Sequence, residues 1–514
     1  MLENSGTLST GRKLALGSGL RVLLLAGTAI VSFFLMPFVV HSLGDRMYGI
    51  WTLVATFIGY YGLLDLGFSS AVTRYLAAGI GAGDHEDCNR VFNTSLVLFS
   101  LLAVAVLLVT AVLAAAAPVL SRTAADADLF RKLILILGLN LAVAFPFRAI
   151  IGTLNAALRY DITAGLELLT LLIRSALIVA VLLAGHKILG MAWATLVAGI
   201  PSMLLYLRLT RRALPFLRLE KQYWGRHTAH RLFSYSAYTF IGQVADLLRF
   251  QVDNLVVAGF VSVAMVTHYS IAGTLVAYFI NLMTAATGVF SSVFSRQSGA
   301  NDQEGLQRTL LFATKLSVCM STFIAFGLIA WGKPFIARWM GTPYLDAYPP
   351  LLVLTLGAML ALWQSPSVGL LYGISRHKFF ALFNSLEGVA NLILSLVLVR
   401  SYGLVGVALG TFVPMAITKI FIQPAYVCRV GGIPYRKYML ELGRTVGLLA
   451  ISLIAPAVLS AYYVRPEYTS LVAIGAASLV LYCIPVLMFE FTPSETRVLQ
   501  DSLLPRLAAR RSAT

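Results

Sequence analysis

Long apolar segments, separated by short stretches of charged and turn-forming residues, follow one another along the whole chain. A membrane-spanning helix needs about 20 predominantly apolar residues, and each of these segments is long enough to supply one. Fourteen spans are predicted, at residues 18–41, 48–72, 91–118, 131–153, 163–185, 188–207, 233–259, 264–293, 310–332, 349–372, 379–399, 403–427, 445–464 and 469–489. The pattern therefore predicts an all-α polytopic membrane protein in which many neighbouring helices form hairpins.

Composition excludes the soluble alternatives. Of 514 residues, 59% are hydrophobic and 12% are charged, against roughly 25% charged in ordinary soluble domains. The formal charge of +17 invites a nucleic-acid interpretation, but the basic residues are scattered between apolar segments rather than gathered on one face. The four cysteines lie far apart and indicate neither a disulfide framework nor a zinc site. We expect membrane lipids, and no nucleic acid, among the partners.

The distribution of Lys and Arg between successive connections predicts the orientation. With a cytoplasmic N-terminus, the inside segments carry 25 basic residues and the outside segments carry nine. Basic residues accumulate in cytoplasmic loops, so both termini are expected in the cytoplasm, which requires an even number of spans. The polar start of the chain continues into the first apolar run without a signal-peptide cleavage site. These features predict an uncleaved, multi-pass membrane protein.

An internal duplication predicts the domain organisation. Residues 188–195, between spans five and six, are repeated loosely at residues 404–411, between spans eleven and twelve, at an offset of 216 residues. Such repeats are typical of transporters, in which the halves move against each other around a substrate. The prediction is an N-lobe at 1–207, a basic cytoplasmic linker at 208–231, a C-lobe at 232–428, and two further spans with a cytoplasmic tail at 429–514. The linker is either an amphipathic helix in the headgroup layer or a basic loop that only fixes topology.

Enzymatic chemistry has little support in the sequence. No segment outside the spans is long enough for a catalytic domain, and no phosphate-binding motif of the GxxxxGK[ST] form is present. The seven histidines are dispersed without the spacing of metal ligands. We therefore expect a protein without enzymatic activity, catalytic residues, metal or cofactor.

Ionisable residues inside the spans are the informative exceptions, because each costs about 2.5 to 3.5 kcal/mol to insert at the centre of a helix. The basic ones are Arg148, Arg174, Arg249, Lys315 and Lys419, and the acidic ones are Asp65, Glu167, Asp246, Asp253 and Glu387. Arg148 and Arg174 are predicted to face a cavity, where a guanidinium can bind phosphate through two parallel hydrogen bonds.

For the remaining basic residues the alternatives differ. Arg249 shares a helix face with Asp246 and Asp253, so it either neutralises them or lines the cavity. Lys315 and Lys419 are nearer the span ends, and we expect them to extend to the membrane interface.

Span two contains the stretch Gly62-Leu63-Leu64-Asp65-Leu66-Gly67-Phe68-Ser69-Ser70-Ala71-Val72-Thr73-Arg74-Tyr75. Gly67 and the small residues after it permit close helix approach or local unwinding. Asp65 is expected to have a structural role, either capping the freed amides or pairing with Arg74.

This stretch and the preceding Leu43-Gly44-Asp45-Arg46-Met47-Tyr48-Gly49-Ile50-Trp51 carry a family resemblance. With the Asp253-Asn254-Leu255-Val256 stretch and the two six-helix halves, the chain resembles the polysaccharide transport family. These are the O-antigen and exopolysaccharide flippases of the multidrug/oligosaccharidyl-lipid/polysaccharide exporter superfamily. The resemblance implies a flippase that moves an undecaprenyl-diphosphate-linked oligosaccharide from the cytoplasmic to the periplasmic leaflet for O-antigen, capsule or exopolysaccharide synthesis. It also suggests a glycan polymerase and export machinery as partners.

The resemblance implies sites as well. A cationic lumen between two lobes would take its contacts to pyrophosphate or sugar acids from Arg148, Arg174, Arg249 and Arg21. Some relatives bind Na⁺ among spans seven, eleven and twelve, where the candidates here are Asp253, Asn391, Ser395 and Thr411, with Glu387 as a nearby carboxylate. Ser395 stands where an acidic ligand is expected. A proton relay through Glu387 or Asp253, and a purely structural polar cluster, therefore remain open.

Two rival functions also remain. A cation-coupled multidrug antiporter of the same superfamily would have twelve spans and more acidic than basic residues in its lobes. A membrane scaffold for glycan assembly would have no passage for a substrate.

Overall fold

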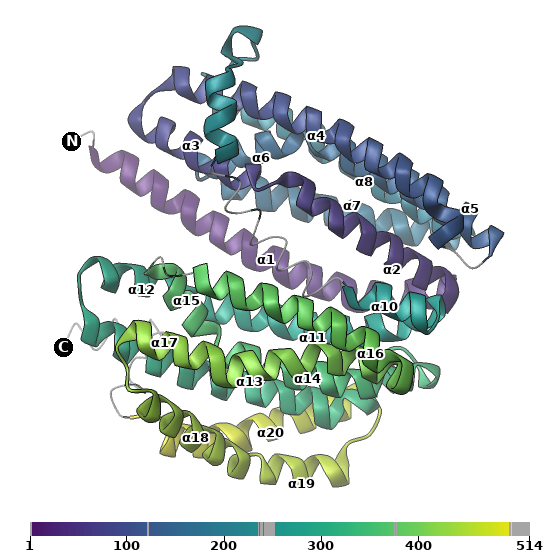
Figure 1. Cartoon of the computed structure of the whole chain (residues 1–514), viewed down its shortest axis with the longest axis vertical. Helices are drawn as coiled ribbons and strands as arrows, with labels where there is room; N and C mark the ends of the chain where they lie inside the picture. The colour runs from purple at the N-terminus through teal and green to yellow at the C-terminus, as the bar shows by residue number, and fades with distance from the viewer. Residues whose placement is uncertain are drawn as a thin grey trace. The chain divides into compact units, whose positions relative to one another are not determined.

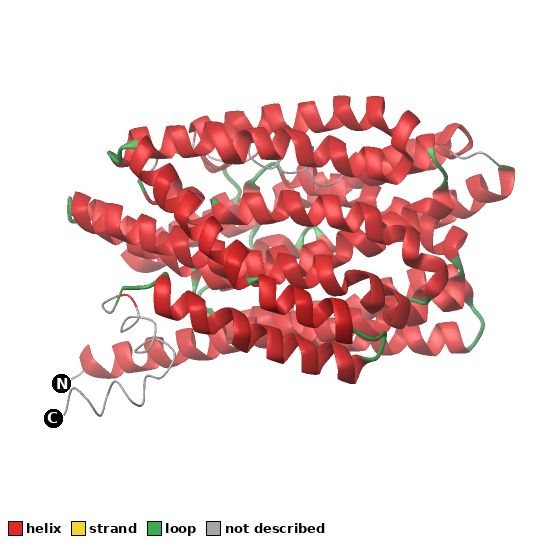
Figure 2. Ribbon diagram, turned by 90° about the horizontal axis from the view of Figure 1, so that it is seen from below, coloured by secondary structure: helices red, strands yellow, loops and turns green. Residues whose placement is uncertain are grey.

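The computed structural model describes residues 3–120, 123–234, 236, 240, 252–374, 376, 378–492 and 495, and these ranges are helical with short turns and no strand (Figures 1 and 2). Eleven stretches within them are long and apolar enough to cross a membrane, or twelve if the bent pair Ala124–Ala144 and Phe147–Ala156 forms one span. The all-α membrane architecture is confirmed.

One of these stretches is itself a hairpin. Leu382–Gly431 has 50 residues, which as a straight helix would be about 75 Å long, more than twice the bilayer core. The backbone leaves the helical conformation at Gly403, where φ is +55°. A Cβ on Gly406 would lie 2.2 Å from the carbonyl oxygen of Leu398, so the two arms pack directly against each other. Counting two spans here is consistent with the predicted fourteen, and most of predicted span seven falls outside the described residues.

By contacts the chain divides into two compact units, Met1–Thr267 and His268–Thr514. The helices of the first unit are α1 (Glu3–Leu43), α2 (Asp45–Tyr60), the 3-10 helix η1 (Tyr61–Asp65), α3 (Phe68–Ala82), α4 (His85–Leu120), α5 (Ala124–Ala144), α6 (Phe147–Ala156), α7 (Tyr160–Leu183), α8 (Lys187–Ala213), the 3-10 helix η2 (Lys221–Tyr223) and α10 (Val252–Phe260). Helix α7 packs against α1 and α8, and α4 packs against α5 (Figure 1). The α5–α6 break, at 43°, precedes Phe147 and contains Pro146, which cannot continue the hydrogen-bond ladder.

The basic linker is a loop rather than an amphipathic helix. Helix α8 ends at Ala213, and the chain after it is largely non-helical up to residue 225. Two side chains of α4 hold it: Asn89 accepts from the Arg218 backbone N–H at 2.7 Å, and Asn93 donates to the Arg218 carbonyl at 2.7 Å. Of the two alternatives left open for the linker, this stretch has the loop, because its backbone hydrogen bonds go to asparagine side chains.

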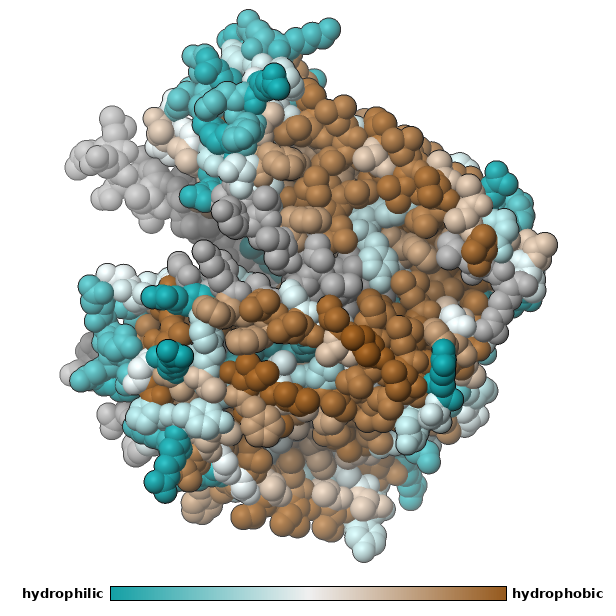
Figure 3. All heavy atoms as spheres, viewed as in Figure 1, coloured by the Kyte–Doolittle hydropathy of each residue, from teal (hydrophilic) through white to brown (hydrophobic). Residues whose placement is uncertain are grey.

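The helices of the second unit begin with the end of α11 (Val263–Thr287). They continue with α12 (Val289–Gly299), α13 (Gln303–Trp339), the 3-10 helix η3 (Thr342–Ala347), α14 (Tyr348–Trp363), α15 (Ser365–Gly373), α16 (Lys378–Ile417), the π-helix η4 (Thr418–Ile422), α17 (Gln423–Gly431), α18 (Tyr435–Ser452), α19 (Ile454–Tyr463) and α20 (Tyr468–Phe489). Helix α13 packs against α14, α18 and α20. Hydrophobic residues dominate the outward helical faces and hydrophilic ones gather at helix ends (Figure 3), as expected for helices that contact lipid.

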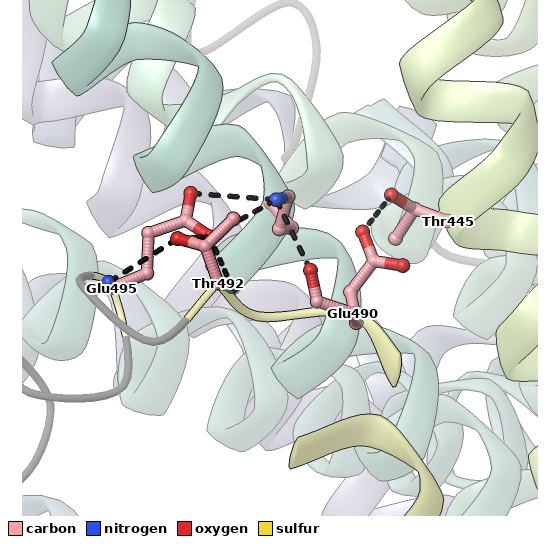
Figure 4. Close-up of polar contacts among 5 residues, drawn as sticks. Thr445, Glu490, Thr492 and Glu495 are labelled. Carbon is pink, nitrogen blue, oxygen red and sulfur yellow. Dashed lines mark hydrogen bonds and ion pairs between the residues drawn. The ribbon is translucent and has the colours of Figure 1, made fainter. Parts of the chain in front are cut away.

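Lys315 of α13 binds the chain just after α20, where Glu490, Thr492 and Glu495 lie (Figure 4). Its Nζ donates to the Glu490 carbonyl at 3.2 Å and to both carboxylate oxygens of Glu495 at 3.3 Å, while Thr445 donates to the Glu490 carboxylate at 2.5 Å. Burial raises the pKa of Glu495, but hydrogen bonds from Thr492 and the charge of Lys315 outweigh this and hold it below the ordinary value. Lys315 thus finds its partners just beyond the end of α20, and its extension to the membrane interface stays a prediction.

Candidate functional site

The distinctive feature of span two is a helix break at its glycine. Helix η1 ends at Asp65, and the next two residues adopt left-handed conformations, with φ of +51° at Leu66 and +80° at Gly67, before α3 begins. A left-handed glycine costs little, whereas a left-handed leucine is strained. The Asp65 carboxylate accepts from the Ser69 hydroxyl at 2.6 Å and from its backbone N–H at 3.4 Å. Local unwinding and capping by Asp65 are both present.

Asp65 also forms an ion pair with Arg148 of α6, at 2.8 Å. The Asp65 side chain is 5% exposed and that of Arg148 is 30% exposed, and the guanidinium lies 4.4 Å from the ring centre of Phe145. Packing of α3 on α6 brings the two charges together across 83 residues of sequence. Sequence spacing suggested Arg74 as the partner of Asp65, because Arg74 lies on the next helical turns, and it gave no signal for Arg148.

A row of polar side chains runs along one face of α7. Tyr160, Glu167 and Arg174 follow at intervals of seven residues, which places them on the same side of a helix. Arg21 of α1 lies over the Tyr160 ring, with its guanidinium carbon 3.9 Å from the ring centre. From Tyr160 to Arg174 the helix rises by about 21 Å. We call Arg21, Tyr160, Glu167 and Arg174 the α7 stripe.

Arg174 is the unusual member of the α7 stripe. It lies near the middle of a 24-residue helix and is exposed. Leu171 and Ile178, three and four residues away on the same face, are both buried. Among the described residues Arg174 has no hydrogen bond or ion pair. An exposed, uncompensated guanidinium at mid-span is costly in contact with lipid, which makes Arg174 a candidate for binding a polar ligand.

The α7 stripe ends at this arginine. The exposed apolar residues of α7, such as Leu172 and Leu183, point in other directions around the helix. Ile178 belongs to a buried cluster with Ile134 and Met191 and closes the face beyond Arg174. Arg249, the remaining predicted lumen residue, lies outside the described residues.

Three of the predicted ion-coupling residues meet inside the α16 hairpin. Ser395 donates to the Asn391 side-chain carbonyl at 2.9 Å, and Thr411 donates to the same oxygen at 3.3 Å. The close arms of the hairpin make this contact: a Cβ on Gly410 would lie 2.1 Å from the Ser395 hydroxyl. Asp253, at the start of α10, is buried in the first unit. The role of these residues in ion coupling stays a prediction.

Glu387 lies one helical turn before Asn391 and is paired with Lys419. The Lys419 Nζ lies 3.4 Å from the Glu387 carboxylate, and the side chains of Lys419 and Glu387 are 4% and 2% exposed. Lys419 also donates to Asn384 at 3.3 Å and to Gln423 at 3.0 Å, and Thr418 donates to Glu387. The expectation that Lys419 extends to the interface is wrong.

The π-helix at Thr418–Ile422 accompanies this pairing. A π turn inserts one extra residue and rotates the side chains that follow, and such turns occur frequently at functional sites. Thr418 and Lys419, its first two residues, are the ones that contact Glu387. Sequence periodicity assumed a regular helix here and could not place Lys419 toward the interior.

The comparisons with known proteins agree with this architecture. A family profile described as polysaccharide biosynthesis protein matches residues 43–349, which is more than half of the chain. The membrane protein EpsK of Bacillus subtilis, itself uncharacterized, is 25% identical over 92% of this chain and 94% of its own length. A protein of Shigella flexneri, provisionally named an O-antigen transporter, is 24% identical to this chain. The match covers 78% of this chain and 96% of the length of that protein.

Solved structures show the same fold. The lipid II flippase MurJ in an inward closed conformation superposes with a TM-score of 0.66 at 17% identity, covering 91% of this chain and 98% of that one. An inward-facing multidrug resistance MATE transporter of the MOP superfamily gives 0.65 at 15% identity, covering 78% of this chain and 95% of that one. The fold is thus shared by transporters of different substrates. By its match to the family profile, the chain belongs to the polysaccharide biosynthesis protein family.

Proposed function

We propose that this protein is a flippase that moves a polyprenyl-diphosphate-linked oligosaccharide from the cytoplasmic to the periplasmic leaflet of the bacterial inner membrane. The α7 stripe carries the proposal, because it places an uncompensated arginine at the centre of a span with other polar groups leading toward it. The family membership and the fold shared with a lipid II flippase support the same substrate class.

The charges of the described spans favour an anionic substrate. The buried carboxylates Asp65 and Glu387 each have a basic partner, Arg148 and Lys419. Arg174 has no acidic partner among the described residues and is available to an anion. A cationic drug would require the opposite balance, and this argues against the multidrug antiporter.

The chemistry required is binding and release without a covalent step. A diphosphate that leaves water needs fixed donors in place of its hydration shell, and a guanidinium matches two phosphate oxygens at once. Arg21 would meet the diphosphate at one end of the α7 stripe and Arg174 at mid-membrane, while the polyprenyl chain stays in lipid. We infer a transporter rather than an enzyme.

Coupling, partners and orientation belong to the same proposal. Na⁺ or H⁺ would give direction by binding one conformation better than the other, with Asp253, Glu387 and the Asn391 cluster as candidates. A glycan polymerase and export machinery would act on the product. The predicted excess of cytoplasmic basic residues places both termini inside.

The test is complementation of a strain that lacks this gene. Arg174→Ala should abolish surface polysaccharide while the protein reaches wild-type levels in the membrane. Arg131→Ala is the matched control, because Arg131 is an exposed arginine on α5 of the same unit, and it should restore export. Normal export by Arg174→Ala would overturn the role of the α7 stripe.

A further inference from the structure

A cavity of about 840 Å³ lies wholly within the second unit, apart from the residues discussed so far. Its volume is typical of small-ligand sites, which range from about 300 to 1,000 Å³. It is formed where α12 passes into α13, where α15 passes into α16, and along α17. Its charged and aromatic lining residues are Arg376, Arg429, Asp302, Phe379, Phe383 and Tyr426.

The two arginines of this cavity are not neutralised within the described part of the chain. Neither Arg376 nor Arg429 has an ion pair there, and both are exposed. The acidic lining residue Asp302 caps α13 by accepting from the Gly305 N–H at 2.8 Å. The two arginines outnumber this single carboxylate in the lining, so the cavity presents a net positive charge to whatever enters it.

The backbone around Arg376 is fixed in place. Its N–H donates to the Leu371 carbonyl at 2.8 Å, and its carbonyl accepts from the Tyr426 hydroxyl at 3.3 Å. Tyr426 also packs on Phe379 and Phe383, with ring centres 5.3 and 6.2 Å apart. A rigid aromatic wall thus stands beside the two charges.

The rim of the cavity continues onto an apolar, exposed strip of α16. Phe379, Leu382 and Leu386 follow at helical spacing and are each more than half exposed. A ligand that extends along this strip has to be apolar at one end, while the arginines require a negative charge at the other. The combination describes an amphiphile with an anionic head.

We propose that this cavity binds the phosphate of an anionic lipid headgroup through Arg376 and Arg429, with an acyl chain along Phe379, Leu382 and Leu386. The connections that line it are among those predicted to be cytoplasmic, where anionic lipids attract basic protein segments. The same phosphate chemistry occurs in soluble molecules, so the test compares both sources. The site shares no residue with the α7 stripe.

The test uses the full-length protein in nanodiscs of phosphatidylcholine with or without labelled phosphatidylglycerol. Binding is measured for the wild type, for Arg376→Ala, for Arg429→Ala and for the double variant. Arg308→Ala is the matched control, because Arg308 is exposed on α13 and pairs with Glu304 outside the cavity. Each variant must first elute as a single monodisperse peak in size-exclusion chromatography. If the double variant fails this requirement, the two single variants still test the site.

Phosphatidylglycerol binding should weaken about tenfold or more in each single variant, since one charge-assisted contact is worth at least that factor. Arg308→Ala should bind as the wild type does. If inorganic pyrophosphate binds and the lipid does not, and if this binding depends on both arginines, the phosphate site belongs to a soluble ligand. Unchanged lipid and pyrophosphate binding in the variants, or equal binding of phosphatidylcholine, would overturn the proposal.

Discussion

The buried pair of Glu387 and Lys419 offers the sharpest test of how this fold holds charge inside a membrane-spanning bundle. Among the described residues, Lys419 contacts Glu387 at 3.4 Å, Asn384 at 3.3 Å and Gln423 at 3.0 Å, and it is 4% exposed. Lys419→Met removes the positive charge and leaves the Glu387 carboxylate buried without this cation. Glu387→Gln removes the negative charge and leaves the Lys419 amine buried without this anion.

The magnitude follows from the burial of both groups. Breaking a buried ion pair by removing one partner typically costs about 3 to 5 kcal/mol, whereas replacing both partners can be nearly neutral. We therefore expect each single variant to lose stability in that range, and Glu387→Gln with Lys419→Met to lose much less than the sum. The coupling free energy between the two sites should exceed about 1 kcal/mol.

The assay is equilibrium unfolding of the purified protein by SDS titration, with the four members of the cycle measured side by side. Lys437→Met is the control, because Lys437 is exposed on α18, and it should change the free energy of unfolding by less than about 0.5 kcal/mol. Additive losses across the cycle, or a Lys419→Met variant as stable as the control, would refute the reasoning that the pair is buried and coupled.

Two further predictions concern the second unit. Gly410→Ala should cost about 1 to 3 kcal/mol of stability, since the new Cβ would collide with Ser395. Gly447→Ala should leave stability unchanged, because its Cβ would meet no atom within 4 Å. Equal stability of the two variants in thermal unfolding would contradict the tight hairpin. For Glu495 the depressed pKa means that its contact with Lys315 is fully stabilising above the ordinary value of 4.5 and is lost as the pH falls through the lower folded value. Proteolysis of the C-terminal tail should accordingly remain slow at pH 5 and accelerate only below the ordinary value; a Glu495→Gln variant with the same pH profile would disprove the role of this carboxylate.

Much of the architecture could be predicted because lipid imposes simple rules on sequence. Each span must be apolar over its length, and its ends must carry polar or turn-forming residues. The hairpin between α7 and α8 was placed at residues 185–187, and the helices end at Leu183 and resume at Lys187. Gly67 also predicted the break in span two, because a left-handed backbone conformation favours glycine.

The partners of the intramembrane charges could not be predicted, because they depend on packing between distant segments. Asp65 meets Arg148 only when α3 lies on α6, and Lys419 turns toward Glu387 through a π-helix that periodicity does not reveal. The linker could not be assigned from sequence for a related reason. Its composition fits an amphipathic helix or a loop equally well, and the choice depends on asparagines of α4 that hydrogen-bond its backbone.

The cluster of Asn391, Ser395 and Thr411 shows what a resemblance adds to such reasoning. Residues from spans eleven and twelve were expected together through the family alone, and the α16 hairpin brings them together. The structure also shows that the Asn391 oxygen already accepts two hydroxyl groups. A cation at this cluster would have to replace one of those hydrogen bonds.

The central claim is that this protein moves a lipid-linked oligosaccharide between leaflets with Arg174 in its path. The most direct measurement is the leaflet location of the lipid-linked oligosaccharide in spheroplasts of a deletion strain, determined with a glycan-modifying reagent that does not cross the membrane. The account predicts that the intermediate accumulates protected from the reagent, that the wild-type gene makes it accessible, and that Arg174→Ala leaves it protected. An intermediate that is fully accessible in the deletion strain, or that fails to accumulate, would contradict the account.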